Sequence, residues 1–281
     1  MAATINTESA PACETARRRL LSIKGDPFLI ATWERAFFLH FVVEPEVLRA
    51  EVPKPFELEL HEGAACVSLV ALTMSRFRPC RRASPAGLFG RITQQRFLNF
   101  RTYVRCADEP GALFLWGWLS RPFQMKLPSN LFALPYSFAA ADYEHRVEWN
   151  VFAGTVSGGV GLGRFAFRAA IPPAAALQPC LAGSLEEFAL ERYTGYYCRG
   201  TQGRLFRAWH PPWQQAPIQP MIQDASLIFN WFPWFSEAKF SAANFSPGFS
   251  EVWLGRPHRL GKCHPAPKQA RPVLSAFYKM P

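Results

Sequence analysis

Short apolar and aromatic runs, separated by turn-forming residues, follow one another along most of the chain. His61-Glu62-Gly63 and Asp108-Glu109-Pro110-Gly111 each lie between two such runs, where Gly and Pro favour tight turns. Apolar runs joined by tight turns are typical of antiparallel hairpins. The predicted strands are residues 37–43, 56–60, 64–74, 97–106, 112–120, 136–143, 147–153, 160–167, 196–199, 205–210 and 251–254.

Two segments carry helix-start signals. Glu44-Pro45-Glu46 places a proline and two acids where the first turn of a helix favours them. Ser184-Leu185-Glu186-Glu187 has the spacing of a capping box, which predicts a short helix to about Tyr193. The pattern therefore predicts a mainly β, β-rich α+β protein. A long antiparallel meander normally closes or folds over to hide its edges.

The chain shows no repeat of fixed period and no long linker rich in Pro, Gly and Ser. We expect a single β domain over residues 26–256. Residues 1–25 lack apolar periodicity and read as a disordered tail, and residues 257–281 read as a basic, Pro-rich tail.

Composition supports a globular protein, since 49% of the 281 residues are hydrophobic and 19% are charged. Of the formal net charge of +10, residues 1–25 carry +2 and residues 256–281 carry +6. The remaining body is close to neutral, which argues against a groove that tracks phosphates. We expect no specific nucleic-acid partner, although the basic ends leave weak RNA or membrane association as an alternative.

The cysteines and the apolar runs indicate where in the cell the protein is expected. Glu34 and Arg35 interrupt the apolar stretch of residues 28–43, so no transmembrane helix is expected. The seven cysteines are scattered without a C-x-x-C pair, which favours reduced thiols over a disulfide framework or a zinc site. Cys263, beside His264, is interpreted as a tail residue. With no signal-peptide pattern, we expect a cytoplasmic protein of undetermined oligomeric state.

Several common kinds of site are missing from the sequence. The glycines of residues 158–163 fit neither a dinucleotide-binding nor a P-loop spacing, and they predict a hairpin turn instead. The chain contains no Gly-x-Ser-x-Gly elbow and no H-E-x-x-H motif. We therefore expect neither a metal site nor a cofactor.

One predicted strand carries polar side chains at alternate positions. Asn99, Arg101 and Tyr103 share one face of residues 98–104 because successive side chains of a strand point to opposite sides. If this face turns inward, it forms the polar wall of a pocket. The alternative is that it faces water while the apolar face covers the core.

A set of motifs in consistent order resembles the YqjF-like family of uncharacterised bacterial proteins, which is distantly similar to acetoacetate decarboxylase. The motifs cover roughly residues 30–256. They are Phe38-Leu39-His40-Phe41, Pro45-Glu46-Val47-Leu48-Arg49, residues 99–105, Leu134-Pro135-Tyr136, residues 183–188, Glu191-Arg192-Tyr193, His210-Pro211-Pro212-Trp213 and Phe245-Ser246-Pro247-Gly248.

The resemblance implies a closed, cone-like antiparallel β-barrel with short peripheral helices and an internal pocket. Decarboxylases of this superfamily use a lysine after a proline, whose neutral amine forms a Schiff base with a β-keto acid. The matching positions here are Tyr136 and Ser137, and Lys126 is the nearest substitute. Acetoacetate decarboxylation through a Schiff base is therefore expected to be absent.

The leading hypothesis is a pocket that binds a small carboxylate or carbonyl compound. Arg101 would hold the anion, with Asn99, Tyr103 and Tyr136 as further ligand-binding residues. Whether the protein is an enzyme stays open, with Tyr136, Glu191 and His210 as weak catalytic candidates. The alternative is a non-catalytic sensor or partner-binding β-barrel.

Overall fold

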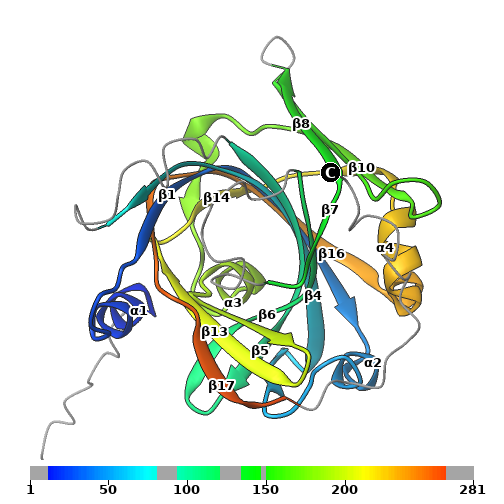
Figure 1. Cartoon of the computed structure of the whole chain (residues 1–281). Coiled ribbons are helices and arrows are strands. Elements are labelled where there is room, and N and C mark those ends of the chain that lie inside the picture. Colours follow the sequence, from blue (N-terminus) through cyan, green and yellow to red (C-terminus); the bar gives the residue numbers. More distant parts are fainter. Residues whose placement is uncertain (1–11, 81–93, 121–133, 147–149, 264–281) are drawn as a thin grey trace, which may run out of the picture.

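A closed ring of seven strands forms the centre of the molecule (Figure 1). The computed structural model describes residues 12–80, 94–120, 134–146 and 150–263. Neighbouring strands pair in the order β16, β1, β4, β5, β6, β12 and β13, and β13 returns to β16. These strands are β1 (Leu29–Val43), β4 (Ala64–Pro79), β5 (Gln95–Cys106), β6 (Glu109–Leu119), β12 (Thr194–Arg199), β13 (Gln202–Trp209) and β16 (Lys239–Leu254).

The pairing around the ring is antiparallel except between β6 and β12, which are parallel. The closing contact is short, because β13 and β16 pair only at Ala208 with Leu254 and Trp209 with Trp253. Further short strands extend the ring. They are β2 (Glu57–Leu58), β3 (Leu60–His61), β7 (Tyr136–Phe138), β11 (Gln178–Pro179), β14 (Gln214–Pro217) and β17 (His258–Lys262).

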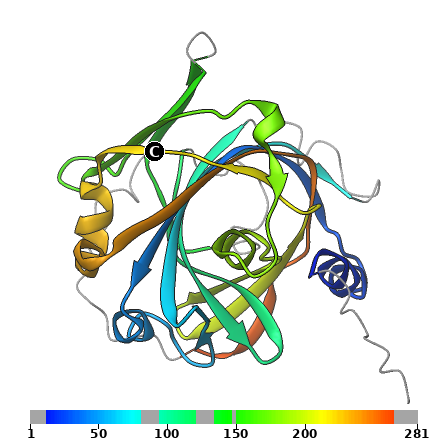
Figure 2. The ribbon, with the colours of Figure 1, turned by 180° about the vertical axis from the view of Figure 1, so that it is seen from behind.

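A second sheet and several short helices complete the structure. The sheet contains β8 (Ala140–Arg146), β9 (Val151–Ser157), β10 (Arg164–Ala170) and β15 (Met221–Asp224). The helices are α1 (Ala12–Leu21), α2 (Pro45–Arg49), α3 (Leu185–Leu190) and α4 (Ser226–Trp231), with 3-10 turns η3 (Ala174–Ala176) and η4 (Pro233–Glu237). In the views of Figures 1 and 2, α3 lies within the opening of the ring, whereas α1, α2 and α4 lie outside it.

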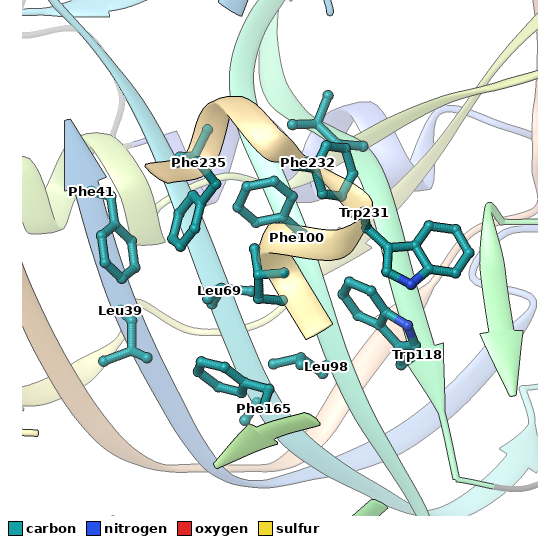
Figure 3. Close-up of a cluster of buried hydrophobic side chains, with 14 of the residues drawn as sticks. Leu39, Phe41, Leu69, Leu98, Phe100, Trp118, Phe165, Trp231, Phe232 and Phe235 are labelled. Atoms are coloured by element: carbon teal, nitrogen blue, oxygen red, sulfur yellow. The ribbon is translucent and has the colours of Figure 1, made fainter. Parts of the chain in front are cut away.

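Strands β1, β4, β5 and β6 are buried on both faces over much of their length. On the outer face, Leu69, Phe100 and Trp118 pack against the α4–η4 segment and the second sheet (Figure 3). On the inner face, Phe38 and Val70 form a separate cluster with residues of α3. A strand covered on both sides needs apolar residues at consecutive positions, which explains the continuous apolar runs of the sequence.

The mainly β fold class and the closed ring with small helices are confirmed. The Ser184 side chain caps α3 by accepting a hydrogen bond from the Glu187 amide at 3.2 Å. The glycine-rich segment at residues 158–163 is the turn between β9 and β10, as predicted. Strand β16 was largely missed, because only residues 251–254 of Lys239–Leu254 were predicted as strand.

Both segments predicted as tails contain ordered structure. Residues 12–21 form α1, whose Leu20 is fully buried, so the expectation of disorder through residue 25 is wrong for this part. Beyond residue 256, β17 pairs with β13. The division of the chain into one domain and two tails otherwise stays a prediction.

The expectation that the cysteines are reduced and unpaired is also wrong for one pair. Cys198 and Cys263 form a disulfide that links β12 to the end of β17, and Cys263 is completely buried. The two residues are 65 positions apart and are brought together by strand pairing, so their spacing in the sequence carried no signal. Among the described residues, no helix is long and apolar enough to cross a membrane.

Candidate functional site

Strand register brings a group of polar side chains together on the inner face of the ring. His40 on β1 pairs with Ser68 on β4, and Ser68 pairs in turn with Arg101 on β5. Asn99 and Tyr103 lie two residues to either side of Arg101 and therefore share its face. Tyr103 belongs to the cluster that packs against α3, which places this face on the inside.

Burial of both faces of β5 decides between the two alternatives that the sequence left open for this strand. Leu98 and Phe100 lie in the outer core, as the second alternative required of the apolar face. The polar face nevertheless turns inward and not to solvent, with Asn99 and Tyr103 at 6% and 0% exposure. The strand has a core on each side.

Arg101 is half-buried and is held by few contacts. Its guanidinium donates one hydrogen bond to the carbonyl of Ala189 in α3 at 3.0 Å. It also lies over the rings of Phe38 and Tyr103 at 5.9 and 5.8 Å. Its Nε is buried, and within the described part of the chain this atom has no hydrogen-bond partner.

Arg101 differs from two other arginines of the ring region in its lack of a counterion. Arg192 pairs with Glu59 and Arg207 pairs with Glu109, in both cases through closely placed carboxylate oxygens. No carboxylate of the described residues lies within 4.0 Å of the Arg101 guanidinium. Arg101 is thus a half-buried cation for which the described ranges supply no carboxylate partner.

A buried hydrogen-bond chain runs beside Arg101. The Ser68 hydroxyl lies 2.5 Å from the Tyr103 hydroxyl and 2.7 Å from His40 Nδ1. Burial, reinforced by the positive charge of Arg101, lowers the pKa of His40 to about 3 and so keeps its imidazole neutral. The Asn244 side chain opposes this effect by raising the pKa of His40. The other ring nitrogen of His40, Nε2, has no hydrogen-bond partner of normal geometry among the described residues.

Tyr136 lies across the inner face of β6 from the neighbouring strand β7. Its hydroxyl donates a hydrogen bond of 2.6 Å to Asn99 Oδ1. Its ring covers Gly117, where a Cβ atom would come within 1.9 Å of the tyrosine Cε1. Burial raises the pKa of Tyr136, and the charge of Arg101 opposes that rise. The neutral phenol is therefore the stable form at neutral pH.

Glu191 and His210 form a different group beyond the end of α3. Glu191 accepts hydrogen bonds from the Tyr193 hydroxyl and, at 2.8 Å, from the Trp213 amide, while burial raises its pKa. His210 lies against the ring of Phe249 at 4.7 Å, and burial lowers its pKa to about 4. In the described part of the chain, no hydrogen bond joins these two candidates to the residues around Arg101, although the charge of Arg101 also lowers the pKa of His210.

Three buried polar side chains on the inner face were not among the site residues predicted from the sequence. They are His40, Ser68 and Asn244, each fully buried. The available signal was a polar residue inside an otherwise apolar strand, as at His40 between Leu39 and Phe41. Burial of such a group normally requires a partner. Only the three-dimensional pairing shows which partner it has.

No described lysine points toward this site. Lys24, Lys54, Lys239 and Lys262 are all exposed at the surface. Lys126, the substitute considered from the sequence, lies outside the described residues. Within the described ranges, no cluster of three or more His, Cys, Asp or Glu side chains is arranged to hold a metal ion.

The fold and the sequence together define the class of protein. A family model described as "Uncharacterized conserved protein", DUF2071, matches residues 30–242, so the chain belongs to this family. Among curated proteins, the uncharacterised protein YqjF of Bacillus subtilis (strain 168) is 28% identical over 189 residues. That match covers 65% of this chain and 72% of YqjF.

Solved structures share the fold at low sequence identity. An acetoacetate decarboxylase-like enzyme from Sphingomonas wittichii RW1 has a TM-score of 0.54 at 14% identity, covering 84% of this chain and 94% of that chain. Acetoacetate decarboxylase from Legionella pneumophila has a TM-score of 0.57 at 12% identity, with coverages of 92% and 99%. The enduracididine biosynthesis enzyme MppR, solved with a condensation product of pyruvate, has a TM-score of 0.57 at 13% identity, with coverages of 84% and 90%.

These matches confirm the resemblance that the motifs indicated. The chain is a DUF2071 protein with an acetoacetate decarboxylase-like fold. At 12–14% identity the structural likeness concerns the fold alone. The chemistry of this chain has to be argued from its own residues.

Proposed function

We propose that this protein binds a small organic carboxylate or carbonyl compound inside the ring, with Arg101 as the anion anchor. The observation that carries the proposal is the position of Arg101, on the inner face of β5 and without a carboxylate partner among the described residues. Partial burial of an arginine charge is favourable when an opposite charge or hydrogen-bond acceptors compensate it. A ligand carboxylate supplies this compensation through the forked donors of the guanidinium.

Residues around Arg101 offer hydrogen bonds for the rest of such a ligand. The Tyr136 hydroxyl donates to Asn99, and its oxygen can still accept a hydrogen bond. The Tyr103 hydroxyl is already engaged with Ser68, so its role is to support the wall on which Arg101 lies. The structural neighbour MppR, which has been solved with pyruvate, gives the fold a precedent for a bound keto acid.

Binding is proposed without a defined reaction. Tyr136 and His210 are both neutral at neutral pH, because burial raises the pKa of the phenol and lowers that of the imidazole to about 4. General acid–base catalysis works best with groups whose pKa lies near the working pH. Tyr136 and His210 therefore add less support than Arg101 does. Burial raises the pKa of Glu191 toward this range, but its hydrogen bonds are to Tyr193 and Trp213 and not to the residues around Arg101.

Binding measured with and without the Arg101 side chain tests the proposal. Ligands extracted from the purified protein should first be identified by mass spectrometry, and pyruvate serves as the initial titration probe. Arg101→Ala should weaken carboxylate binding about tenfold or more, since a charge-assisted hydrogen bond contributes roughly 1.5–3 kcal/mol. Calorimetric titration measures the change.

Arg96→Ala is the matched control, because Arg96 lies on the same strand but pairs with Asp142 at 3.2 Å. This control should bind the probe as the unaltered protein does. Equal binding by the Arg101→Ala variant would contradict the proposed anchor.

We further propose that the site forms no Schiff base. The position expected to supply the amine is Tyr136, and a phenol cannot condense with a ketone. Incubation with acetoacetate and borohydride, followed by intact-mass measurement, should give no stoichiometric adduct. An adduct that peptide mapping places at Lys126, and that Lys126→Arg abolishes, would overturn this expectation.

A further inference from the structure

Aromatic side chains border Arg101 on the inner face of the ring. Phe114 on β6 pairs directly with Arg101 across the β5–β6 register. Directly opposed side chains in antiparallel strands lie about 5 Å apart at Cβ. The Phe114 ring lies 5.8 Å from that of Phe206 on β13 and 6.5 Å from that of Tyr136 on β7. Three strands thus contribute one aromatic surface beside Arg101.

Two glycines make room for these rings. At Gly195 on β12, a Cβ atom would come within 2.5 Å of the Phe206 ring and 2.8 Å of the Phe114 ring. At Gly117, it would overlap the Tyr136 ring. Any larger residue at either position would push a ring away from the surface. The aromatic surface therefore depends on local sequence choices in two strands.

The exposure of the inner face is uneven. Phe38, Val70 and Tyr103 are at most 1% exposed and form packed core. By contrast, Arg101, Phe114, Tyr136 and Phe206 are all half-buried. Arg101 and these three half-buried aromatic side chains thus place a positive charge beside three aromatic rings on the described part of the inner face.

We infer that the ligand of this site is an aryl carboxylate, in which the carboxylate binds Arg101 and a planar aromatic group stacks on Phe114 and Phe206. The inference rests on the proposed function and specifies its substrate class. Aromatic rings pair favourably in offset and edge-to-face arrangements. A short aliphatic acid such as acetate or pyruvate satisfies the arginine but has no aromatic group to stack on these rings.

A comparison of four probes tests the substrate class in the full-length protein. Phenylacetate and phenylpyruvate are aryl carboxylates, acetate is the aliphatic counterpart, and phenylacetamide is the neutral counterpart of phenylacetate. Burial of a phenyl group should make phenylacetate bind about tenfold or more tightly than acetate. Phenylacetamide should bind more weakly than phenylacetate. Calorimetric titration gives each dissociation constant.

The Phe206→Leu variant separates stacking from charge. It should weaken phenylacetate binding several-fold and leave acetate binding unchanged. Phe240→Leu is the matched control, because Phe240 is 46% exposed at the start of β16, away from this surface. If Phe206→Leu fails to fold, the ratio of phenylacetate to acetate affinity in the unaltered protein still decides the inference.

The outcomes distinguish the inference from the function on which it rests. Acetate binding as tightly as phenylacetate would overturn the aryl preference and leave the carboxylate site in place. Phenylacetamide binding as tightly as phenylacetate would overturn the carboxylate site itself. No binding of any of the four probes, with the protein folded, would overturn both.

Discussion

His40 and His210 are two histidines that folding removes almost completely from solvent. Burial lowers their pKa values to about 3 and about 4, whereas the ordinary value is 6.5. As pH falls below 6.5, the unfolded chain takes up protons that the folded chain excludes. The free energy of unfolding should therefore decrease from about pH 6.5 downward, until the folded histidines also become protonated.

The pH effect can be measured by urea unfolding at pH 7, 6 and 5. Each excluded proton contributes at most about 1.4 kcal/mol per pH unit. The His40→Gln variant should show a shallower decrease between pH 6.5 and 5 than the unaltered protein, whatever its stability at pH 7. An identical slope in the two proteins would show that His40 is protonated in the folded state. Glu191, whose pKa is raised by burial, acts in the opposite sense.

Part of the site could be predicted at the scale of residues. Alternation along residues 98–104 correctly placed Asn99, Arg101 and Tyr103 on one face. It could not show that the Tyr103 hydroxyl is hydrogen-bonded to Ser68. Nor could it show that Arg101, unlike Arg192, has no carboxylate partner in the described part of the chain. Those facts depend on side chains from strands far apart in sequence.

The close packing of β7 on β6 predicts the effect of a substitution at Gly117 on stability. Gly117→Ala would place a methyl group against the Tyr136 ring, and overpacking of this kind typically costs about 1–3 kcal/mol. The cost should largely disappear in the Tyr136→Ala background, because the obstructing ring is gone. A double-mutant cycle by urea unfolding measures the coupling.

Both single variants and the double variant are needed, since Tyr136→Ala also removes the hydrogen bond to Asn99. Equal destabilisation by Gly117→Ala in the two backgrounds would mean that another contact, and not the Tyr136 ring, excludes the side chain. A loss of stability confined to the Tyr136-containing background would establish the close approach.

Hairpin elements were predicted well where a tight turn marks them. The β5–β6 and β12–β13 hairpins are both present, because their connecting residues favour turns. Strand β16 was mostly missed since Phe245-Ser246-Pro247-Gly248 looks like a turn. In the structure, Gly248 instead lies against β1, and its positive φ of 92° accommodates a close approach to Trp33.

For the whole molecule, the closed ring could be predicted from the sequence, but the additional strand β17 and the disulfide that fixes its end could not. The family resemblance implied a closed cone, and the order of strands confirms closure. The addition of β17 and the Cys198–Cys263 disulfide depends on contacts across 65 residues. Local signals near Cys263, which lies among Pro and Lys residues, favour an unstructured segment and were misleading.

The pairing of β1 with β16 also constrains when the molecule can fold. Leu39 on β1 pairs with Ala243 on β16, so this side of β1 can pair only after about 200 further residues have been synthesised. During synthesis, β1, β4 and β5 therefore leave the ribosome with apolar residues on both faces and with the edge of β1 unpaired. Exposed edges of this kind favour association between chains. Association between growing chains is therefore favoured until the C-terminal strands emerge.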